Sequence, residues 1–257
     1  MKKNNRDQEK EGLADIAVDP DVLAKELSLE IEIDPLEQID KDNFPKESLN
    51  ITSECNEALK LLKGDREQRI QGLRIFCEYR DQRSFPLLLP LLDQPCPVER
   101  MSAVYALGRN PCPDAVQKLV SLLEGDDNAY VRRATAWSLA NYDNQIVLKP
   151  LINALKNDVA AVRLWSSSSL AEIGGISAHN AQLAAEQLLI SLKIDNEPGV
   201  RSNCIWSLSR LYERLNEDIQ ENFIDECTKI ALFDKEPSVM EEAKVALDAM
   251  GMQGFYN

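Results

Sequence analysis

The chain has 257 residues, of which 44% are apolar and 28% charged, and its formal net charge is −14. This composition is typical of a globular protein long enough to bury a sizeable core. No apolar run is as long as the roughly 18 residues of a membrane-spanning helix, and no apolar segment of the kind found in secretory signals is present. Because Lys and Arg are not in excess, a nucleic-acid backbone is a poor candidate for the main ligand. We therefore expect a cytoplasmic protein that binds neither nucleic acid nor membrane.

Residues 1–50 differ in composition from the rest of the chain. They hold 14 Asp and Glu against 7 Lys and Arg, so a fifth of the length supplies half of the net charge. Their apolar patches are short, and burying them offers little to offset the entropy of ordering. We predict a mostly disordered acidic leader over residues 1–50 and a folded region over residues 51–257. The alternative is that the leader covers the apolar flank of the folded region.

The folded region is repetitive, and its repeats align on one arginine. Each copy has an acidic turn, a Val-Arg pair and a helical pattern with Leu seven residues after the Arg. The clearest copies are residues 126–142, 157–174 and 195–212. Weaker copies are residues 64–80, 93–110 and 234–251, and the second of these has one extra residue just before its arginine. The anchor residues are Arg69, Arg100, Arg132, Arg163, Arg201 and Met240.

The separations between the anchors are 31, 32, 31, 38 and 39 residues, which fits two short helices and two turns in each repeat. Segments between the anchored helices, such as PLLLPLL and DAVQKLVSLL, have apolar residues at helical spacing. Proline and Gly-Asp pairs lie between the helices, where they end or begin one. We predict an all-α fold, an α-solenoid of about six helical hairpins. The two longer separations predict extended loops or helices, the first near residues 174–182.

An aspartate recurs in step with the arginine in three repeats. It lies in the turn before the anchored helix, where it is placed to cap that helix. The arginine lies in the first helical turn, where its planar fork can bond the aspartate and carbonyls of a neighbouring repeat. We predict a structural ladder along one edge of the stack, with an anion-binding arginine row as the alternative. The ladder residues are Arg100, Asp126, Arg132, Asp158, Arg163, Asp195 and Arg201.

Aromatic residues recur five positions after the anchor, where the residues are Tyr105, Trp137, Ser168 and Trp206. At about 100° per residue, this position faces away from the core of its own hairpin. Since the second helices of such solenoids line the concave side, the rings are expected to form an exposed stripe that binds a protein partner. The alternative is that each ring lies sideways against the next repeat. The predicted partner-binding residues are Met101, Tyr105, Arg109, Arg133, Trp137, Leu164, Trp206 and Arg210.

The sequence offers little for catalysis or cofactor binding. It has no recognisable phosphate loop or zinc-ligand spacing, and the lone histidine, His179, has no nucleophile motif beside it. We predict no catalytic residue, no cofactor and no metal site. Among the six cysteines, Cys96 and Cys112 each lie between two prolines and are predicted to be exposed thiols. They flank one helix at opposite ends, more than about 20 Å apart, and so cannot share one metal.

Four segments resemble the phycobilisome-lyase-type HEAT-like repeat family of cyanobacteria: RMSAVYALGRNP, AYVRRATAWSLANY, AAVRLWSSSSLAEIG and VRSNCIWSLSRL. The resemblance covers residues of about 55–251. Within this family the chain, acidic leader included, is most similar to members that interact with the A-type iron–sulfur carrier IscA. This similarity implies a non-catalytic adaptor in iron–sulfur homeostasis. The broader family implies an alternative, a phycobilin lyase or bilin-handling chaperone acting on phycobiliproteins. We carry over no catalytic residue, because the shared motif is structural.

Overall fold

The computed structural model describes the backbone of residues 48–252 and the side chains of residues 52–252. Every regular element in this part of the chain is an α-helix or a short 3-10 helix, which confirms the predicted all-α class. The predicted acidic leader lies outside the described residues except for residues 48–50, which belong to the first described helix, α2. No helix in the described range combines the length and apolarity needed to cross a bilayer.

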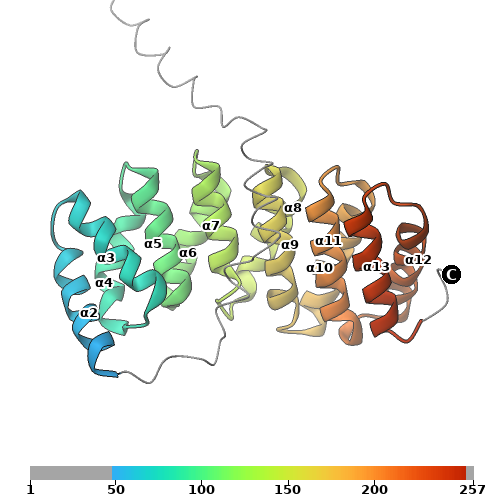
Figure 1. Cartoon of the computed structure of the whole chain (residues 1–257), viewed down its shortest axis with the longest axis horizontal. Helices are drawn as coiled ribbons and strands as arrows, with labels where there is room; N and C mark the ends of the chain where they lie inside the picture. Colours follow the sequence, from blue (N-terminus) through green and yellow to red (C-terminus); the bar gives the residue numbers. More distant parts are fainter. Residues whose placement is uncertain (1–47, 253–257) are drawn as a thin grey trace, which may run out of the picture. The chain divides into compact units, whose positions relative to one another are not determined.

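The helices form successive hairpins, each with a first and a second helix (Figure 1). The first helices are α2 (Ser48–Leu61), α4 (Phe85–Leu88) continued by the 3-10 helix η2 (Leu89–Asp93), α6 (Val116–Gly125), α8 (Leu148–Asn157), α10 (Ala178–Ile194) and α12 (Glu217–Phe233). The second helices are α3 (Arg66–Glu78), α5 (Pro97–Arg109), α7 (Ala129–Leu139), α9 (Ala160–Gly174), α11 (Pro198–Leu211) and α13 (Pro237–Ala249). Short 3-10 helices in the connections are η1 (Gln82–Ser84), η3 (Pro113–Ala115), η4 (Gln145–Val147) and η5 (Tyr212–Arg214). The described residues thus contain the predicted six hairpins.

Local sequence explains where the second helices begin. Proline occupies the first position of α5, α11 and α13, where its missing N–H costs no hydrogen bond. Asp65 caps α3 in a reciprocal arrangement with Gln68, and the Asn128 side chain caps α7.

The first helices depart from a uniform pattern in two places. The segment PLLLPLL forms α4 and then the 3-10 helix η2, because Pro90 has no N–H to continue the α-helical ladder. Helices α10 and α12 have 17 residues each, whereas α6 and α8 have 10. The longer anchor separations therefore arise from longer first helices.

The second helices pack against one another in chain order, from α3 to α13 (Figure 1). Neighbouring first helices contact each other less extensively. The cause is a column of small buried residues six positions after the anchor, Ala106, Ser138, Ser169, Ser207 and Ala246. Small side chains let helices approach closely, and Ser169 Oγ donates to the Ala136 carbonyl of the preceding helix at 2.9 Å. The second helices therefore form the more tightly packed layer of the array.

Candidate protein-binding face

Each ladder arginine bonds a carboxylate of the following repeat. Its Nε and Nη2 donate to the two oxygens of one aspartate at 2.6–3.2 Å, in the pairs Arg100–Asp126, Arg132–Asp158, Arg163–Asp195 and Arg201–Asp234. Its Nη1 donates to a carbonyl of the turn before its own helix. The sequence prediction was the reverse: it paired each arginine with the aspartate of its own repeat and with carbonyls of a neighbouring repeat. The hydrogen bond to Asp195 raises the pKa of Arg163 above its ordinary value.

The ladder aspartates do not cap the second helices, contrary to the sequence prediction. They end the first helices α6, α8 and α10, and the N-cap positions of the second helices are Asn128, Val159 and Glu197. The carboxylates accept backbone N–H groups inside the turn instead, as Asp195 does from Glu197 at 3.0 Å. One carboxylate therefore both closes its own turn and holds the arginine of the preceding repeat.

The first rung uses a glutamate. Arg69 pairs with Glu99 at 2.7 Å, and Glu99 is only 2% exposed. Glu99 is the extra residue that the repeat alignment places just before Arg100. The aspartate expected from the alignment, Asp93, instead forms an ion pair with Lys118. The insertion thus supplies the carboxylate that this rung would otherwise lack.

The four central second helices, α5, α7, α9 and α11, present one regular outward face. Residues three, four, six and seven positions after each anchor are all buried, whereas residues one, five and nine positions after it are all at least partly exposed. We call these outward residues the second-helix face: Met101, Tyr105, Arg109, Arg133, Trp137, Asn141, Leu164, Ser168, Glu172, Ser202, Trp206 and Arg210. All eight residues predicted for partner binding lie on it. Asn141 and Glu172 were not predicted, although each lies one helical turn after the aromatic position.

Tyr105 and Trp137 form one aromatic patch on this face. Their ring centroids are 5.3 Å apart with the rings tilted at 53°, and Arg133 Nη2 donates to the Tyr105 hydroxyl at 3.4 Å. A Cβ at Gly108 would lie 2.5 Å from the Trp137 ring. Both rings are half-buried, and each contacts the neighbouring repeat. The structure therefore combines the two predicted alternatives, rings exposed on an outward face and rings lying sideways against the next repeat.

Trp206 forms a second patch and is 37% exposed. The Arg210 guanidinium lies over its ring at 4.9 Å from the centroid and also bonds Glu172 at 2.9 Å. Between the two patches Ser168 interrupts the aromatic column, and its hydroxyl accepts a hydrogen bond from Asn203 at 2.7 Å. Met101 and Leu164 are half-buried and pack against the core. The stripe is therefore two aromatic patches joined by a polar and aliphatic stretch.

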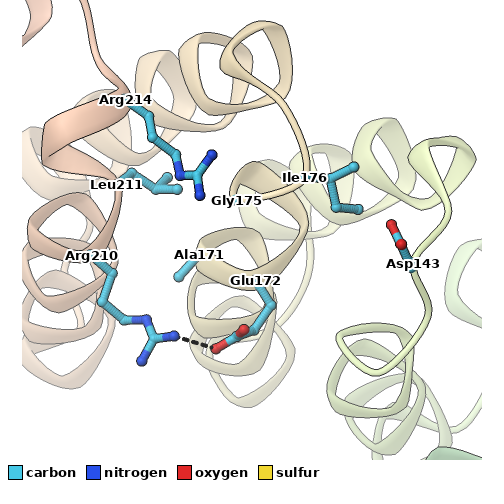
Figure 2. Close-up of a pocket in the computed structure, with 8 residues that line it drawn as sticks. All are labelled: Asp143, Ala171, Glu172, Gly175, Ile176, Arg210, Leu211 and Arg214. Atoms are coloured by element: carbon cyan, nitrogen blue, oxygen red, sulfur yellow. Dashed lines mark hydrogen bonds and ion pairs between the residues drawn. The ribbon is translucent and has the colours of Figure 1, made fainter.

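A pocket of about 430 Å³ opens beside the second patch, where the connections after α7, α9 and α11 meet (Figure 2). Arg210 and Arg214 lie on one side, and Asp143 and Ile176 lie on the other. Ala171, Glu172, Gly175 and Leu211 complete the lining. Arg214 was not predicted from the sequence, because it lies beyond the repeat in η5.

The two proline-flanked thiols differ from each other. Cys96 is partly exposed and accepts a hydrogen bond from Arg66 Nη2 at 3.0 Å. Cys112 was predicted to be exposed, but it is buried, with 6% exposure. Tyr142 of the next repeat lies beside this loop, and its hydroxyl donates to the Leu107 carbonyl at 3.0 Å. Within the described range no three potential metal-ligating side chains converge.

Comparisons with known proteins agree with this architecture. A family model for HEAT repeats matches residues 56–140 and 116–209. An engineered protein of known structure is 20% identical, with a TM-score of 0.56 over 76% of this chain and 98% of that chain. A designed armadillo repeat protein is 19% identical, with a TM-score of 0.53 over 76% and 98%. Another, solved in complex with peptide (KR)4, is 20% identical, with a TM-score of 0.51 over 83% and 95%. These structures show the fold alone, and no curated protein matches the chain.

Proposed function

Because the chain belongs to the HEAT-repeat family, we propose that it is a non-catalytic adaptor that binds a protein partner through the second-helix face. The observation that carries the proposal is the exposed Trp206, held under Arg210 on a face whose outward positions repeat regularly. Tryptophan and arginine are the side chains most enriched among binding hot spots. The designed armadillo protein with a bound peptide supports a peptide-like partner for this architecture.

Trp206→Ala tests the proposal. Trp206 is partly exposed, so truncation should shift the melting temperature by only a few degrees, about 1 kcal/mol or less. Partner affinity should fall at least tenfold, about 1.4 kcal/mol. The partner is first identified by capture from a lysate of the native host, and its affinity is then measured with purified components.

Phe233→Ala is the matched control. Phe233 is a 79% exposed aromatic residue at the end of α12, in the first-helix layer. Its truncation should leave partner affinity unchanged. Equal loss of affinity in both variants, or no loss in Trp206→Ala, would show that the partner does not bind through the second-helix face.

The specific partner that the sequence resemblance implies is an A-type iron–sulfur carrier, and we propose it as the first one to test, in the cytoplasm. This assignment rests on the resemblance to the cyanobacterial IscA-interacting HEAT-repeat protein. Titration of the purified carrier into the chain should show saturable binding that Trp206→Ala weakens. Absence of binding would exclude this carrier as the partner. The adaptor proposal would then be tested with the protein captured from the lysate.

The alternative, a phycobilin lyase or bilin chaperone, has less support from the face. The ionisable side chains on it are three arginines, Glu172 and Tyr105, and Glu172 is already paired with Arg210. A lyase needs a group that transfers protons near its substrate. Mixing the protein with free bilin tests this alternative, since binding would change the visible absorbance.

A further inference from the structure

The pocket beside Trp206 holds charges of both signs. Arg210 and Arg214 lie on one side of it, and Asp143 lies on the other (Figure 2). Arg210 already has partners, since its guanidinium lies over the Trp206 ring at 4.9 Å from the centroid and bonds Glu172 at 2.9 Å. Because Arg210 and Glu172 also line the pocket, the second-helix face continues from the exposed Trp206 ring into it.

Arg214 and Asp143 are the two charged groups of the pocket that lack a partner among the described residues. Both residues are exposed, and neither the Arg214 guanidinium nor the Asp143 carboxylate forms a hydrogen bond or ion pair with a described residue. They border the same hollow but do not pair with each other (Figure 2). Each can therefore bond a group of opposite charge without first breaking a bond to a described residue.

The helix ends add to the difference between the two sides. Helix α9 ends at the pocket with Gly175 as its C-cap, and its last turn has no basic residue. The C-terminal end of a helix carries partial negative charge, which adds to that of Asp143. Helix α11 ends at the same pocket, but Arg210 lies in its last turn and Arg214 follows in η5. The pocket is therefore negative towards Asp143 and positive towards Arg214.

Apolar groups line the space between the charges. They are Ala171, Gly175, Leu211 and Ile176, and Ile176 is 38% exposed. The methylene groups of long charged side chains can lie on such a lining while their charged ends reach polar partners. A bound segment would also displace water from the pocket, and ion pairs are stronger where water is excluded. The volume of about 430 Å³ is within the range of about 300–1,000 Å³ that is usual for binding pockets.

We propose that this pocket binds a segment of the partner that carries one acidic and one basic side chain, the acidic one on Arg214 and the basic one on Asp143. This inference rests on the proposed function and adds the chemistry of the partner to it. A segment with two charges of the same sign would be attracted by one side of the pocket and repelled by the other. In an extended segment, side chains that point in the same direction are two residues apart. The segment therefore has an acidic and a basic residue separated by one residue.

Four labelled peptides test this combination of charges. Each has the sequence Leu-Ser-X-Ser-X-Ser-Leu with blocked ends, and the two X positions are Glu and Lys, Lys and Glu, Glu and Glu, or Lys and Lys. Binding to the full chain is followed by fluorescence anisotropy. We expect one of the two mixed peptides to bind at least tenfold more tightly than either like-charged peptide. A like-charged peptide that binds as tightly as the better mixed one, or failure of all four to bind, would overturn the proposal.

Charge reversals locate the binding site. Arg214→Glu should make the peptide with two lysines the tightest binder, and Asp143→Lys should do the same for the peptide with two glutamates. Lys149→Glu and Asp114→Lys are the matched controls, since they reverse the same charges at exposed positions of α8 and η3, outside the pocket. The controls should leave the order of the four affinities unchanged. Equal effects of the reversals and their controls would show a long-range effect of net charge and overturn the proposal.

Partner capture with the same variants separates this inference from the adaptor function. If Trp206→Ala weakens capture and neither reversal in the pocket does, the partner binds the second-helix face without the pocket, and only the inference about its charges is wrong. If the reversals weaken capture and Trp206→Ala does not, the inference holds and the aromatic patch is not the anchor. If none of the three changes weakens capture, the adaptor proposal for this face fails and the inference fails with it.

Discussion

Arg163 and Asp195 are 32 residues apart in the sequence and form a bidentate ion pair, in which Nε and Nη2 of the arginine each donate to a carboxylate oxygen at 2.7 Å. The same arginine donates through Nη1 to the Asp158 carbonyl at 3.0 Å, and the same carboxylate accepts the Glu197 N–H at 3.0 Å. One rung therefore fixes the turn before α9 to the turn before α11. Repetition of this arrangement along the array sets the offset between hairpins, and so aligns the outward positions of the second helices.

Removal of one rung arginine should destabilise the array. Arg163→Ala leaves a carboxylate whose side chain is only 6% exposed without its cation. We expect the free energy of unfolding to fall by roughly 1–3 kcal/mol, measured by denaturant titration. Arg214→Ala is the control, since Arg214 is exposed and makes no ion pair with a described residue. It should change stability by about 0.5 kcal/mol or less. Similar losses in the two variants would contradict a specific role for the ladder.

Gly108 permits the close approach of α5 to Trp137. A Cβ at this position would lie 2.5 Å from the Trp137 ring, 2.9 Å from Ser138 Oγ and 3.1 Å from the backbone of Ser138. Gly108→Ala should therefore lower the free energy of unfolding by roughly 1–3 kcal/mol through overpacking. Gly125→Ala, where nothing lies within 4 Å of the added Cβ, should be neutral or stabilising by about 0.4–1 kcal/mol. If both changes had the same effect on the denaturation midpoint, the crowding at Trp137 would not be the cause.

The sequence predicted the hairpins because apolar periodicity and proline positions are local patterns. It could not predict which carboxylate each ladder arginine bonds. The aspartate nearest to the arginine in the sequence belongs to the same repeat, whereas the aspartate that bonds it belongs to the following repeat. Glu99 illustrates the limit: it looked like an insertion, and it completes a rung with Arg69. The helical pattern likewise placed Tyr105 and Trp137 on one face, but their mutual contact depends on how closely α5 and α7 approach.

Cys96 should be the first thiol to react with an alkylating reagent near neutral pH. Burial raises its pKa, but backbone N–H groups of Glu99 and Val98, together with Arg66, outweigh burial and lower the pKa overall. The thiolate is the reactive form, so a lower pKa at a partly exposed position speeds modification. Cys77, whose pKa is raised to about 12 by burial, should react slowly. Mass spectrometry of iodoacetamide-treated protein reads the order of modification, and Arg66→Ala should slow the reaction at Cys96 specifically. Earlier modification of Cys77 or Cys112 would contradict the assignment.

The last hairpin should open more readily than the central ones. Met240 stands where the preceding second helices have the ladder arginine, and among the described residues no further helix packs beyond α13. The hairpin is held to the rest by its own core contacts and by the rung from Arg201 to Asp234 at 2.8 Å. Amide hydrogens of residues 240–249 should therefore exchange faster than those of residues 132–139, measured by mass spectrometry or NMR.

Two variants separate the missing rung from simple fraying at the end of the array. Arg201→Ala removes the rung that holds the turn before α13, so exchange there should rise further while exchange in α7, which keeps its own rungs, stays unchanged. Met240→Arg should give no added protection, because no further helix follows α13 among the described residues, and so no next-repeat turn is described that could supply a carboxylate. If Met240→Arg slowed exchange as much as an intact rung does, the arginine would act through its own turn carbonyls alone. If the amides of α13 exchanged as slowly as those of α7 in the unmodified chain, the missing rung would not control the local opening of the last hairpin.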